Sequence, residues 1–420
     1  MLSQLSSQLL FYLPLGIVGL WRWGTWLMRI IVGRFYRPIT GEFQTSVSIV
    51  VPVYNEKPEL FQLALDSWRA NNPAEIISVI DATDTSSIGI FQEFSRGFKG
   101  AKLIITEKPG KRQALADGAV VANGDIIAFV DSDTIWDDSL LKHALPPFAD
   151  PSIGGVSTRQ NVFHPKTLAQ NMFDIQLDLR FTDDMKPSEV AGSAFTCLSG
   201  RTALYRRKAV LPFLDDLVNE RFWGKQCIGG DDKRLTYLIE AAGWKASYQH
   251  NARVYTPGAG DLATLFKQRT RWSRNSWRAD LRAMWLGWVW KHPFLSFILI
   301  DRAVSTITPL FSLVYFIVSL ILGLWIPAII LVSWWHISRA LKIMPNLARH
   351  PSNIKLIPVY IVVNFATVIT RLYALLTMNR QDWLTRGAQK KPRSFGLLLA
   401  RLGTFAIIAG MILLVYYTRL

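Results

Sequence analysis

The hydrophobic pattern divides the chain into apolar stretches at both ends and a more polar middle. Near the N-terminus, apolar residues run from Leu9 to Val32 and are interrupted by Arg22 and Arg29. Towards the C-terminus, the stretches 303–338, 356–378 and 402–418 together contain one Arg and no Lys, Asp or Glu. A bilayer core of about 30 Å needs about 20 apolar residues in a helix. These stretches therefore predict membrane helices.

Basic residues beside these stretches predict their orientation. Arg34 and Arg37 follow the first stretch and place the polar middle in the cytosol, because positively charged flanks remain inside. We expect the side chains of Arg22 and Arg29 to extend toward the same membrane face. The last stretch, 402–418, follows a basic segment and predicts a terminal span.

The two central stretches predict different arrangements. As one helix, residues 303–338 would be about 54 Å long, so we expect two short spans joined near Gly323 and Pro327. The stretch 356–378 has basic residues on both flanks, and a simple crossing would place one of those flanks outside. A re-entrant or interfacial arrangement is therefore favoured there, and a full span stays open as the alternative.

The polar middle alternates short apolar runs with helical patterns, which is typical of a mainly parallel sheet covered by helices on both faces. The predicted strands are Val47–Val53, Ile76–Asp81 and Ile126–Asp131, and the predicted helices between them are Leu60–Ala70 and Arg112–Ala122.

Composition narrows the range of functions. Half of the residues are hydrophobic and the net charge is +16, which suits anionic lipids or a phosphorylated substrate. Lys and Arg are spread along the chain rather than gathered in a tail, so we expect no nucleic-acid partner. The two cysteines, Cys197 and Cys227, form no disulfide framework, in keeping with a cytosolic polar domain.

Acidic residues follow each predicted strand: Glu56, Asp81 and Asp131. Ligands bind at the carboxyl ends of parallel strands, so these three acids predict a site. Asp131 and Asp133 lie two residues apart and are able to hold a divalent ion that grips a diphosphate. An ordinary turn is the alternative, because Asp is frequent in turns.

Two glycine-containing motifs precede predicted helices. Gly110-Lys111-Arg112 offers backbone N–H groups and cations that suit phosphate, although a solvated basic turn fits equally well. Asp231 and Asp232 stand before the predicted helix Lys233–Ala242. One of these carboxylates is a candidate general base for a sugar hydroxyl, and the alternative is that both only complement the helix dipole.

An aromatic and basic segment, Gln268–Trp272, precedes a predicted membrane-surface helix. Arg271 suits a diphosphate and Trp272 suits stacking on a sugar ring, although the segment fits a membrane anchor equally well. The following helix has one apolar stripe, which predicts an interfacial position. The stripe consists of Trp277, Leu281, Met284, Trp285 and Trp288.

Taken in order, these motifs resemble those of processive family-2 glycosyltransferases, and most closely the hyaluronan synthase branch, which is near the chitin and cellulose synthases. The resemblance extends from about residue 45 to residue 400. It is carried by PVYNE (Pro52–Glu56), Asp81, GKRQA (Gly110–Ala114), VDSD (Val130–Asp133), CLSG (Cys197–Gly200), GGDDKRLT (Gly229–Thr236), QRTRW (Gln268–Trp272) and WLTR (Trp383–Arg386).

The resemblance implies a GT-A-like α/β cytosolic glycosyltransferase domain combined with an α-helical transmembrane domain. It implies that Tyr54, Glu56 and Asp81 hold uridine and that Lys111 holds the phosphate region of a UDP-sugar. Asp131 and Asp133 would organise Mg²⁺ or Mn²⁺.

On the acceptor side, the resemblance implies that Asp232, beside Asp231, is the catalytic base. Gln268, Arg271 and Trp272 would line the acceptor and diphosphate sites, and Cys197 would lie near the acceptor sugar. Trp383 and Arg386 would close a gating loop near 379–394 over UDP, which requires this loop to face the cytosol.

The resulting prediction is a monomeric, integral cell-membrane enzyme that polymerises UDP-sugars with inversion and passes the growing polysaccharide through its own spans, in contact with membrane lipids. The predicted segments are an N-terminal span and linker (1–41), a cytosolic catalytic domain (42–275), interface helices (276–302) and a C-terminal membrane region (303–420).

Differences from the usual family motifs leave the identity of the polymer undetermined. Lys233 and Arg234 follow Asp232 where hyaluronan synthases usually have Arg and then His, and Leu384 replaces the usual Gly of the gating loop. A non-processive transferase that moves one sugar to a lipid, and a non-enzymatic membrane protein with a degenerate domain, are the alternatives. Intact acids at Asp131, Asp133 and Asp232 oppose the second alternative.

Overall fold

A computed structural model describes residues 19–108, 110–381 and 395–417. Its centre is an eight-stranded sheet with the strand order β3-β2-β1-β4-β7-β6-β10-β5. A two-stranded hairpin, β8 (Arg221–Phe222) and β9 (Lys225–Gln226), lies outside this sheet. The strands of the main sheet are β1 Val47–Val53, β2 Glu75–Asp81, β3 Ala101–Thr106, β4 Ile126–Val130, β5 Ile135–Trp136, β6 Ile153–Val162, β7 Thr202–Arg206 and β10 Lys245–Thr256.

The three predicted strands are confirmed as β1, β2 and β4, which are parallel and adjacent. Their continuous apolar runs suit strands that are covered on both faces. The prediction of a mainly parallel sheet is confirmed for β3-β2-β1-β4, and β6 and β10 are also parallel to each other. In the other half, β7 runs antiparallel to both β4 and β6, so the whole sheet is mixed.

Helices cover both faces of the sheet. Ile49 and Val51 pack with α2 and α3 on one face, whereas Val50 and Ile77 pack with α4 on the other. This division follows from the alternation of side chains along a strand. The helices of the polar part are α2 Pro58–Ala70, α3 Thr85–Arg96, α4 Lys111–Val121, α5 Leu140–Ala144, α6 Leu168–Arg180, α7 Lys186–Ala191, α8 Arg207–Val210, α9 Leu214–Val218, α10 Asp231–Ala241 and α11 Leu262–Leu286.

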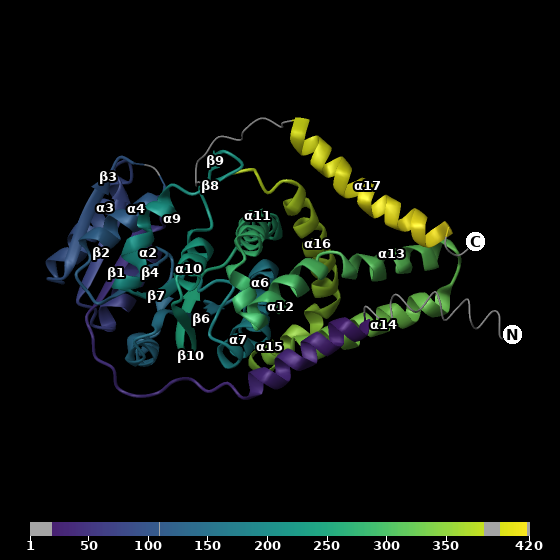
Figure 1. Cartoon of the computed structure of the whole chain (residues 1–420), viewed down its shortest axis with the longest axis horizontal. Coiled ribbons are helices and arrows are strands. Elements are labelled where there is room, and N and C mark those ends of the chain that lie inside the picture. The colour runs from purple at the N-terminus through teal and green to yellow at the C-terminus, as the bar shows by residue number, and fades with distance from the viewer. Residues whose placement is uncertain (1–18, 109, 382–394, 418–420) are drawn as a thin grey trace.

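Beyond α11, the residues that the structure describes are mostly helical. Figure 1 shows α13, α14 and α17 extending from α16 on the side away from the sheet. By length and apolar composition, Pro293–Ile321 and Pro351–Leu376 are able to cross a membrane. The helices of this part are α12 Pro293–Val304, α13 Thr308–Ile321, α14 Trp325–Lys342, α15 Met344–Arg349, α16 Ile357–Leu376 and α17 Phe395–Tyr417.

The predicted break in the stretch 303–338 is confirmed. Helices α13 and α14 form an antiparallel pair in Figure 1, and Gly323 between them has a φ of 69°. This left-handed conformation suits glycine because it has no Cβ. Pro327 lies in the first turn of α14, where the missing N–H leaves no helix bond unmade.

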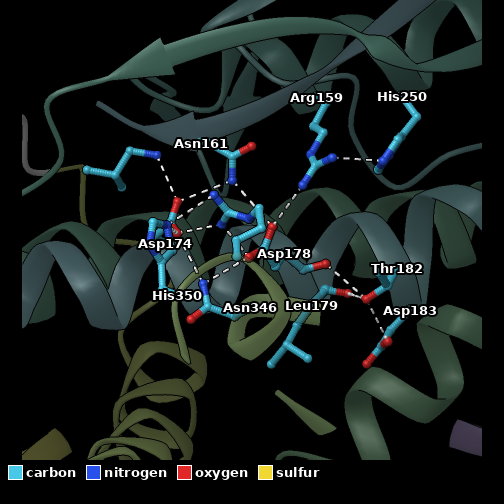
Figure 2. Close-up of polar contacts among 12 residues, drawn as sticks. Arg159, Asn161, Asp174, Asp178, Leu179, Thr182, Asp183, His250, Asn346 and His350 are labelled. Carbon is cyan, nitrogen blue, oxygen red and sulfur yellow. Dashed lines mark hydrogen bonds and ion pairs between the residues drawn. The ribbon is translucent and has the colours of Figure 1, made fainter. Parts of the chain in front are cut away.

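A buried polar cluster attaches the segment before α16 to the polar domain (Figure 2). Asp174 and Asp178 of α6 accept hydrogen bonds from Asn346 Nδ2 of α15 at 3.1 and 2.9 Å. Arg349 pairs with both carboxylates. Asn161 of β6 donates to them from the other side. The start of α16 is thereby held against α6.

The other end of α16 is held by α11. Arg278 Nη1 donates to the carbonyl oxygen of Met378 at 2.6 Å, and Arg274 Nε donates to Thr377 Oγ1 at 3.0 Å. Both flanks of α16 therefore contact the polar domain, as their basic residues suggested. α16 itself is one unbroken helix of 20 residues, within a segment long and apolar enough to cross a membrane. Its arrangement relative to a membrane stays a prediction.

The N-terminal helical residues, 19–34, lie along α14 (Figure 1). The expectation that Arg22 and Arg29 extend to the membrane face is wrong. Arg29 pairs with Asp301 at 2.6 Å and with Asp184 at 2.9 Å, and Arg22 pairs with Asp301 at 3.3 Å. Carboxylates from distant segments, invisible to a local pattern, neutralise both side chains inside the protein.

Glu189 of α7 gives a pH-dependent contribution to stability. Burial raises the pKa of Glu189 to about 7, although Tyr248 N and Ser247 Oγ donate hydrogen bonds to it. Because the folded pKa lies above the ordinary value, its stabilising contribution is present below about pH 4.5 and is lost as the pH rises through 7.

We therefore expect Glu189→Gln to raise the free energy of unfolding by roughly 1–3 kcal/mol at pH 8 and to leave it unchanged near pH 5. Thermal unfolding of the purified protein at both pH values measures this. Glu93→Gln, at an exposed position of α3, is the control. An equal gain at both pH values would contradict the assignment.

Candidate active site

The carboxyl ends of the parallel strands gather the predicted acids at one edge of the sheet. Ser132 Oγ, after β4, donates to Glu56 Oε2, after β1, at 2.9 Å. Asp81 ends β2, and its Oδ1 accepts from Thr83 N at 2.9 Å, which shapes the turn into α3. Tyr54 is exposed beside them. An open, polar surface for a ligand results.

Lys111 connects three of the predicted motifs. It begins α4, and its Nζ lies 2.6 Å from Asp131 Oδ1 and 3.0 Å from Asp231 Oδ2. Burial opposes the charge on Lys111, but Asp131 and Asp231 outweigh it and raise the pKa of the ammonium group. Lys111 therefore remains charged and holds the carboxylates from β4 and α10 together.

The two adjacent acids of α10 have different surroundings. α10 begins at Asp231, two residues before its predicted start, and the preceding Gly230 has a φ of 81°. Burial would raise the pKa of Asp231, but Lys111 outweighs it and the pKa lies below its ordinary value. Asp232 Oδ2 accepts from Gly200 N at 3.1 Å, and its Oδ1 accepts from Lys233 N at 2.8 Å.

A small pocket joins these groups. Its polar lining consists of Lys111, Ser199, Gly200, Asp231 and Asp232, and apolar side chains of the core close its base. Asp231 forms an ion pair with Lys111, whereas Asp232 forms no ion pair among the described residues. The arrangement leaves Asp232 as the carboxylate able to take a proton.

Arg112 has a different role from the one its motif suggested. Its side chain is buried and donates to Gly229 O at 2.9 Å and Leu217 O at 2.7 Å, and it pairs with Glu220 at 2.7 Å. Arg112 therefore supports the glycine loop before α10 from behind. The expectation that Arg112 is directed at phosphate is wrong, and phosphate binding by Lys111 stays a prediction.

Arg201 is a site residue that the sequence analysis missed. Its guanidinium carbon lies 5.0 Å from the ring centre of Phe173 and 5.6 Å from that of Trp272. Burial lowers the pKa of Arg201, and the carboxylates of Asp131 and Asp133 oppose this, which places it within their field. Its position directly after the CLSG motif was the available signal.

Cys197 lies within the electrostatic influence of Asp232, and its place near the acceptor sugar stays a prediction. Burial raises the pKa of the Cys197 thiol to about 12, and the charge of Asp232 contributes. Arg180 of α6 donates to the Cys197 carbonyl oxygen at 2.7 Å. The thiol is therefore protonated at neutral pH and serves as a wall of the site rather than as a nucleophile.

Gln268–Trp272 lies inside α11, not before it, because α11 is one continuous helix that also crosses the predicted domain boundary at 275/276. Trp272 packs on Phe173 with ring centres 5.7 Å apart, and Gln268 is half-buried one turn away.

The predicted apolar stripe of α11 is exposed only in part. Trp285 is 90% exposed, but Trp277 donates to the Arg371 carbonyl oxygen at 3.1 Å, and Met284 and Trp288 pack on a buried cluster. The helix is therefore enclosed between the polar domain and α16 over most of its length.

A second, basic pocket lies between α11, the glycine loop and the end of α16. Its lining includes Arg271, and the Ile228 N–H beside it donates to Gln381 Oε1 at 3.2 Å. Trp383 and Arg386 lie outside the described residues. The other lining residues are Gly229, Arg274, Asn275, Arg278 and Arg380.

Comparison with known proteins decides the family. A model described as "Glycosyltransferase like family 2" matches residues 44–275, more than half of the chain. The chain belongs to this family. As a family-2 member it is a glycosyltransferase, and the predicted enzyme class is confirmed.

Relatives of this family-2 chain align over most of its length. An N-acetylglucosaminyltransferase of Rhizobium meliloti (strain 1021) is 26% identical over 377 residues, 84% of each chain. A hyaluronan synthase of Streptococcus pyogenes is 24% identical over 383 residues, 86% of this chain and 88% of that one.

A solved structure supports the predicted GT-A-like fold. The mannosyltransferase PcManGT from Pyrobaculum calidifontis, in complex with GDP-Man and Mn²⁺, matches with a TM-score of 0.57 at 18% identity. The match covers 87% of this family-2 chain and 99% of the mannosyltransferase.

Arg201→Lys tests the aromatic and cationic platform. Lysine keeps the charge near Asp131 and Asp133 but loses the planar group that lies over the rings of Phe173 and Trp272. We expect turnover to fall about tenfold, a loss of the size of one strong contact, with donor affinity within about threefold of the original. Arg253→Lys, at an exposed position of β10, is the control. Unchanged turnover of Arg201→Lys would contradict a role of Arg201 in the site.

Proposed function

We propose that this enzyme is a processive, inverting β-glycosyltransferase that polymerises UDP-sugars and passes the product through its own membrane helices. The donor is UDP-N-acetylglucosamine, with or without UDP-glucuronate. The relatives named as an N-acetylglucosaminyltransferase and as a hyaluronan synthase support this donor class.

The donor would bind at the carboxyl edge of the sheet. Tyr54, Glu56 and Asp81 would contact uridine, and Lys111 the diphosphate. No group of three or more His, Cys, Asp or Glu side chains is placed to hold a metal among the described residues. Mg²⁺ or Mn²⁺ would fit all the same, because such ions are held by one or two carboxylates together with substrate phosphates.

Asp131 and Asp133 supply the two hard oxygen donors that this arrangement needs. A divalent cation held there would neutralise charge on the departing diphosphate. The solved mannosyltransferase named above contains Mn²⁺ beside its nucleotide-sugar.

Asp232 would act as the general base. It takes the proton of an acceptor hydroxyl while that oxygen attacks the anomeric carbon, and the bond from this carbon to the UDP oxygen breaks. The attack comes from the face opposite to UDP, so the configuration inverts. Lys111 forms an ion pair with Asp231 and keeps it in its charged form. Asp232 is therefore the carboxylate that would contact the acceptor hydroxyl.

The position of Trp272 carries the processive part of the proposal. Trp272 and Phe173 form an aromatic wall with Arg201 beside the catalytic carboxylates, and Cys197 lies near Asp232. α11, which bears Trp272, packs directly along α16. A polymer bound at this wall would lie between the active site and the helices that extend away from the sheet.

The membrane helices and the loop after α16 complete the proposal. The two long apolar stretches and the hyaluronan synthase relatives support membrane association, with the catalytic domain and both flanks of α16 in the cytosol. Gln268 and Arg271 are proposed to line the acceptor and diphosphate sites, and Trp383 and Arg386 to close a gating loop over UDP. A single chain holds all of these residues, so we propose that a monomer suffices.

UDP release by the purified protein, with UDP-sugars supplied singly and in pairs, tests the proposal together with product size. A ladder of long chains supports polymerisation. A single labelled glycolipid would instead indicate a non-processive transferase, and no release with any donor would contradict both functions.

A further inference from the structure

Asp280 of α11 is a buried carboxylate outside the active-site pocket. The residue is 5% exposed. Its Oδ1 lies 2.6 Å from Lys233 Nζ and accepts a hydrogen bond from the Tyr237 hydroxyl at 2.7 Å. Arg302 of α12 approaches the other oxygen, with Nη1 3.5 Å from Oδ2. Burial would raise the pKa of Asp280, but Lys233 and Arg302 outweigh it and hold the pKa below its ordinary value. Asp280 is therefore charged at neutral pH and joins α10 to α11.

Another face of α10 holds the segment 195–200, which contains the CLSG motif. Asp232, Thr236 and Glu240 follow one another at intervals of four residues and so lie on one side of the helix. Each of these side chains accepts a hydrogen bond from a backbone N–H of the segment. The donors are Gly200 N to Asp232 at 3.1 Å, Leu198 N to Thr236 at 3.0 Å and Phe195 N to Glu240 at 2.7 Å.

The contact with Asp280 fixes the rotation of α10 about its own axis. Lys233 and Tyr237 lie one turn apart on the face next to that of Asp232, and both reach the same oxygen of Asp280. Neighbouring side chains on a helix point about 100° apart. A rotation of α10 that broke the contact with Asp280 would therefore also redirect the Asp232 carboxylate.

α11 carries the aromatic wall as well as Asp280. Trp272 lies eight residues before Asp280 in the same unbroken helix, about 12 Å along its axis. Arg302, which reaches Asp280 from α12, also donates from Nη2 to Thr196 Oγ1 at 3.2 Å, next to Cys197. Asp280 thus connects the helix that bears Asp232, the helix that bears Trp272 and the segment beside Cys197.

We propose that Asp280 is a positioning residue for glycosyl transfer: through Lys233 and Tyr237 it sets the rotation of α10 that directs Asp232 at an acceptor hydroxyl beside Trp272. This inference rests on the proposed general-base role of Asp232 and adds a residue that touches neither substrate. The alternative is an ordinary ion pair that joins two helices and has no influence on the reaction.

The double variant Lys233→Met/Asp280→Asn separates positioning from stability. Asp280→Asn alone leaves the buried Lys233 ammonium group without its carboxylate, which lowers stability. In the double variant this charge is gone, asparagine still accepts from the Tyr237 hydroxyl, and Arg302 keeps Asp184 at 3.9 Å. We expect the unfolding temperature to fall in Asp280→Asn and to return to within about 3 °C of the original in the double variant.

Turnover is the deciding measurement. It is followed as UDP released by the purified full-length protein, with the donor or donor pair that the unmodified protein accepts. We expect kcat to be lowered between about tenfold and a hundredfold in both Asp280→Asn and the double variant, because a misplacement of about 1 Å costs up to about a hundredfold. The donor KM should stay within about threefold of the original, since the strand-end acids and Lys111 are unchanged.

Tyr237→Phe is a milder variant that removes only the hydroxyl and keeps the ion pair, so the fold is retained. Its kcat should fall between about threefold and tenfold, the size of one hydrogen bond. The matched control is Lys102→Met/Glu75→Gln, which removes an ion pair of 2.5 Å at the opposite edge of the sheet, where β2 begins. The control is expected to change the unfolding temperature and to leave kcat and donor KM unchanged.

The outcomes separate this inference from the proposed function. Original kcat in the double variant and in Tyr237→Phe would overturn the positioning role and leave the proposed function standing. A donor KM that rises in step with the loss of kcat would also overturn it, because the defect would then lie in donor binding. No UDP release by the unmodified protein with any donor contradicts the proposed function, and the positioning role with it.

Discussion

Asp232→Asn is expected to lower polymer synthesis by about a thousandfold, within the range usual for loss of a general base. Asparagine keeps one of the two oxygens that accept from Gly200 N and Lys233 N, so the start of α10 loses one hydrogen bond and should retain its helical structure. It has no basic carboxylate to take the acceptor proton. Synthesis from a UDP-sugar, measured as UDP released, gives the size of the loss.

Donor binding separates this role from a structural one. UDP-sugar affinity of Asp232→Asn should stay within about threefold of the original, because Asp131, Asp133 and Lys111 are untouched. Asp216→Asn, at an exposed position of α9, controls for the change in charge. Loss of UDP-sugar binding in Asp232→Asn would contradict the assignment of Asp232 as the general base.

Lys111→Met should produce the second large effect, on donor binding and on stability together. The variant leaves the buried Asp231 and the half-buried Asp131 without their shared cation. Removing one partner of a buried ion pair costs about 3–5 kcal/mol, and the donor diphosphate loses its cation as well. We expect donor affinity to fall at least about a hundredfold, a change of about 2.7 kcal/mol in binding free energy.

The pH dependence identifies the cause of the loss in stability. Lys111 holds the pKa of Asp231 below its ordinary value, so the stabilisation is present above about pH 4 and is lost as the pH falls through the folded pKa. The gap in unfolding free energy between the original and Lys111→Met should therefore be largest at pH 7 and narrow below pH 4. Lys108→Met, at an exposed position near the start of α4, should show no gap.

The predicted strands and helices came from local side-chain patterns. They are present in the structure because the tertiary contacts favour the same local conformations. Val47–Val53 and Ile126–Val130 are apolar on both faces, so they are stable only where helices cover both sides of a sheet. The acids after them were expected to meet because parallel strands end at one edge. Glu56 and Asp131 lie at this edge, and Ser132 connects them.

The local patterns failed where a distant partner decided the outcome. Arg112 and Lys111 are neighbours in the sequence, yet Lys111 joins the site and Arg112 supports the loop behind it. The segment Gln268–Trp272 was expected just before a helix. In the structure, Arg269, Arg274 and Arg278 are buried inside α11, and hydrogen bonds to α16 make this position stable.

The sequence by itself determined the division into apolar ends and a polar α/β middle, the strand runs, the helix pair broken near Gly323, and the acids that the family uses. These features depend on side-chain periodicity and on a few adjacent residues. Only the tertiary structure decided that Lys111 bridges Asp131 and Asp231, that Arg201 lies over the rings of Phe173 and Trp272, and that Arg269 is buried against Thr367. Each of these depends on contacts between segments far apart in the chain, and no local pattern records such contacts.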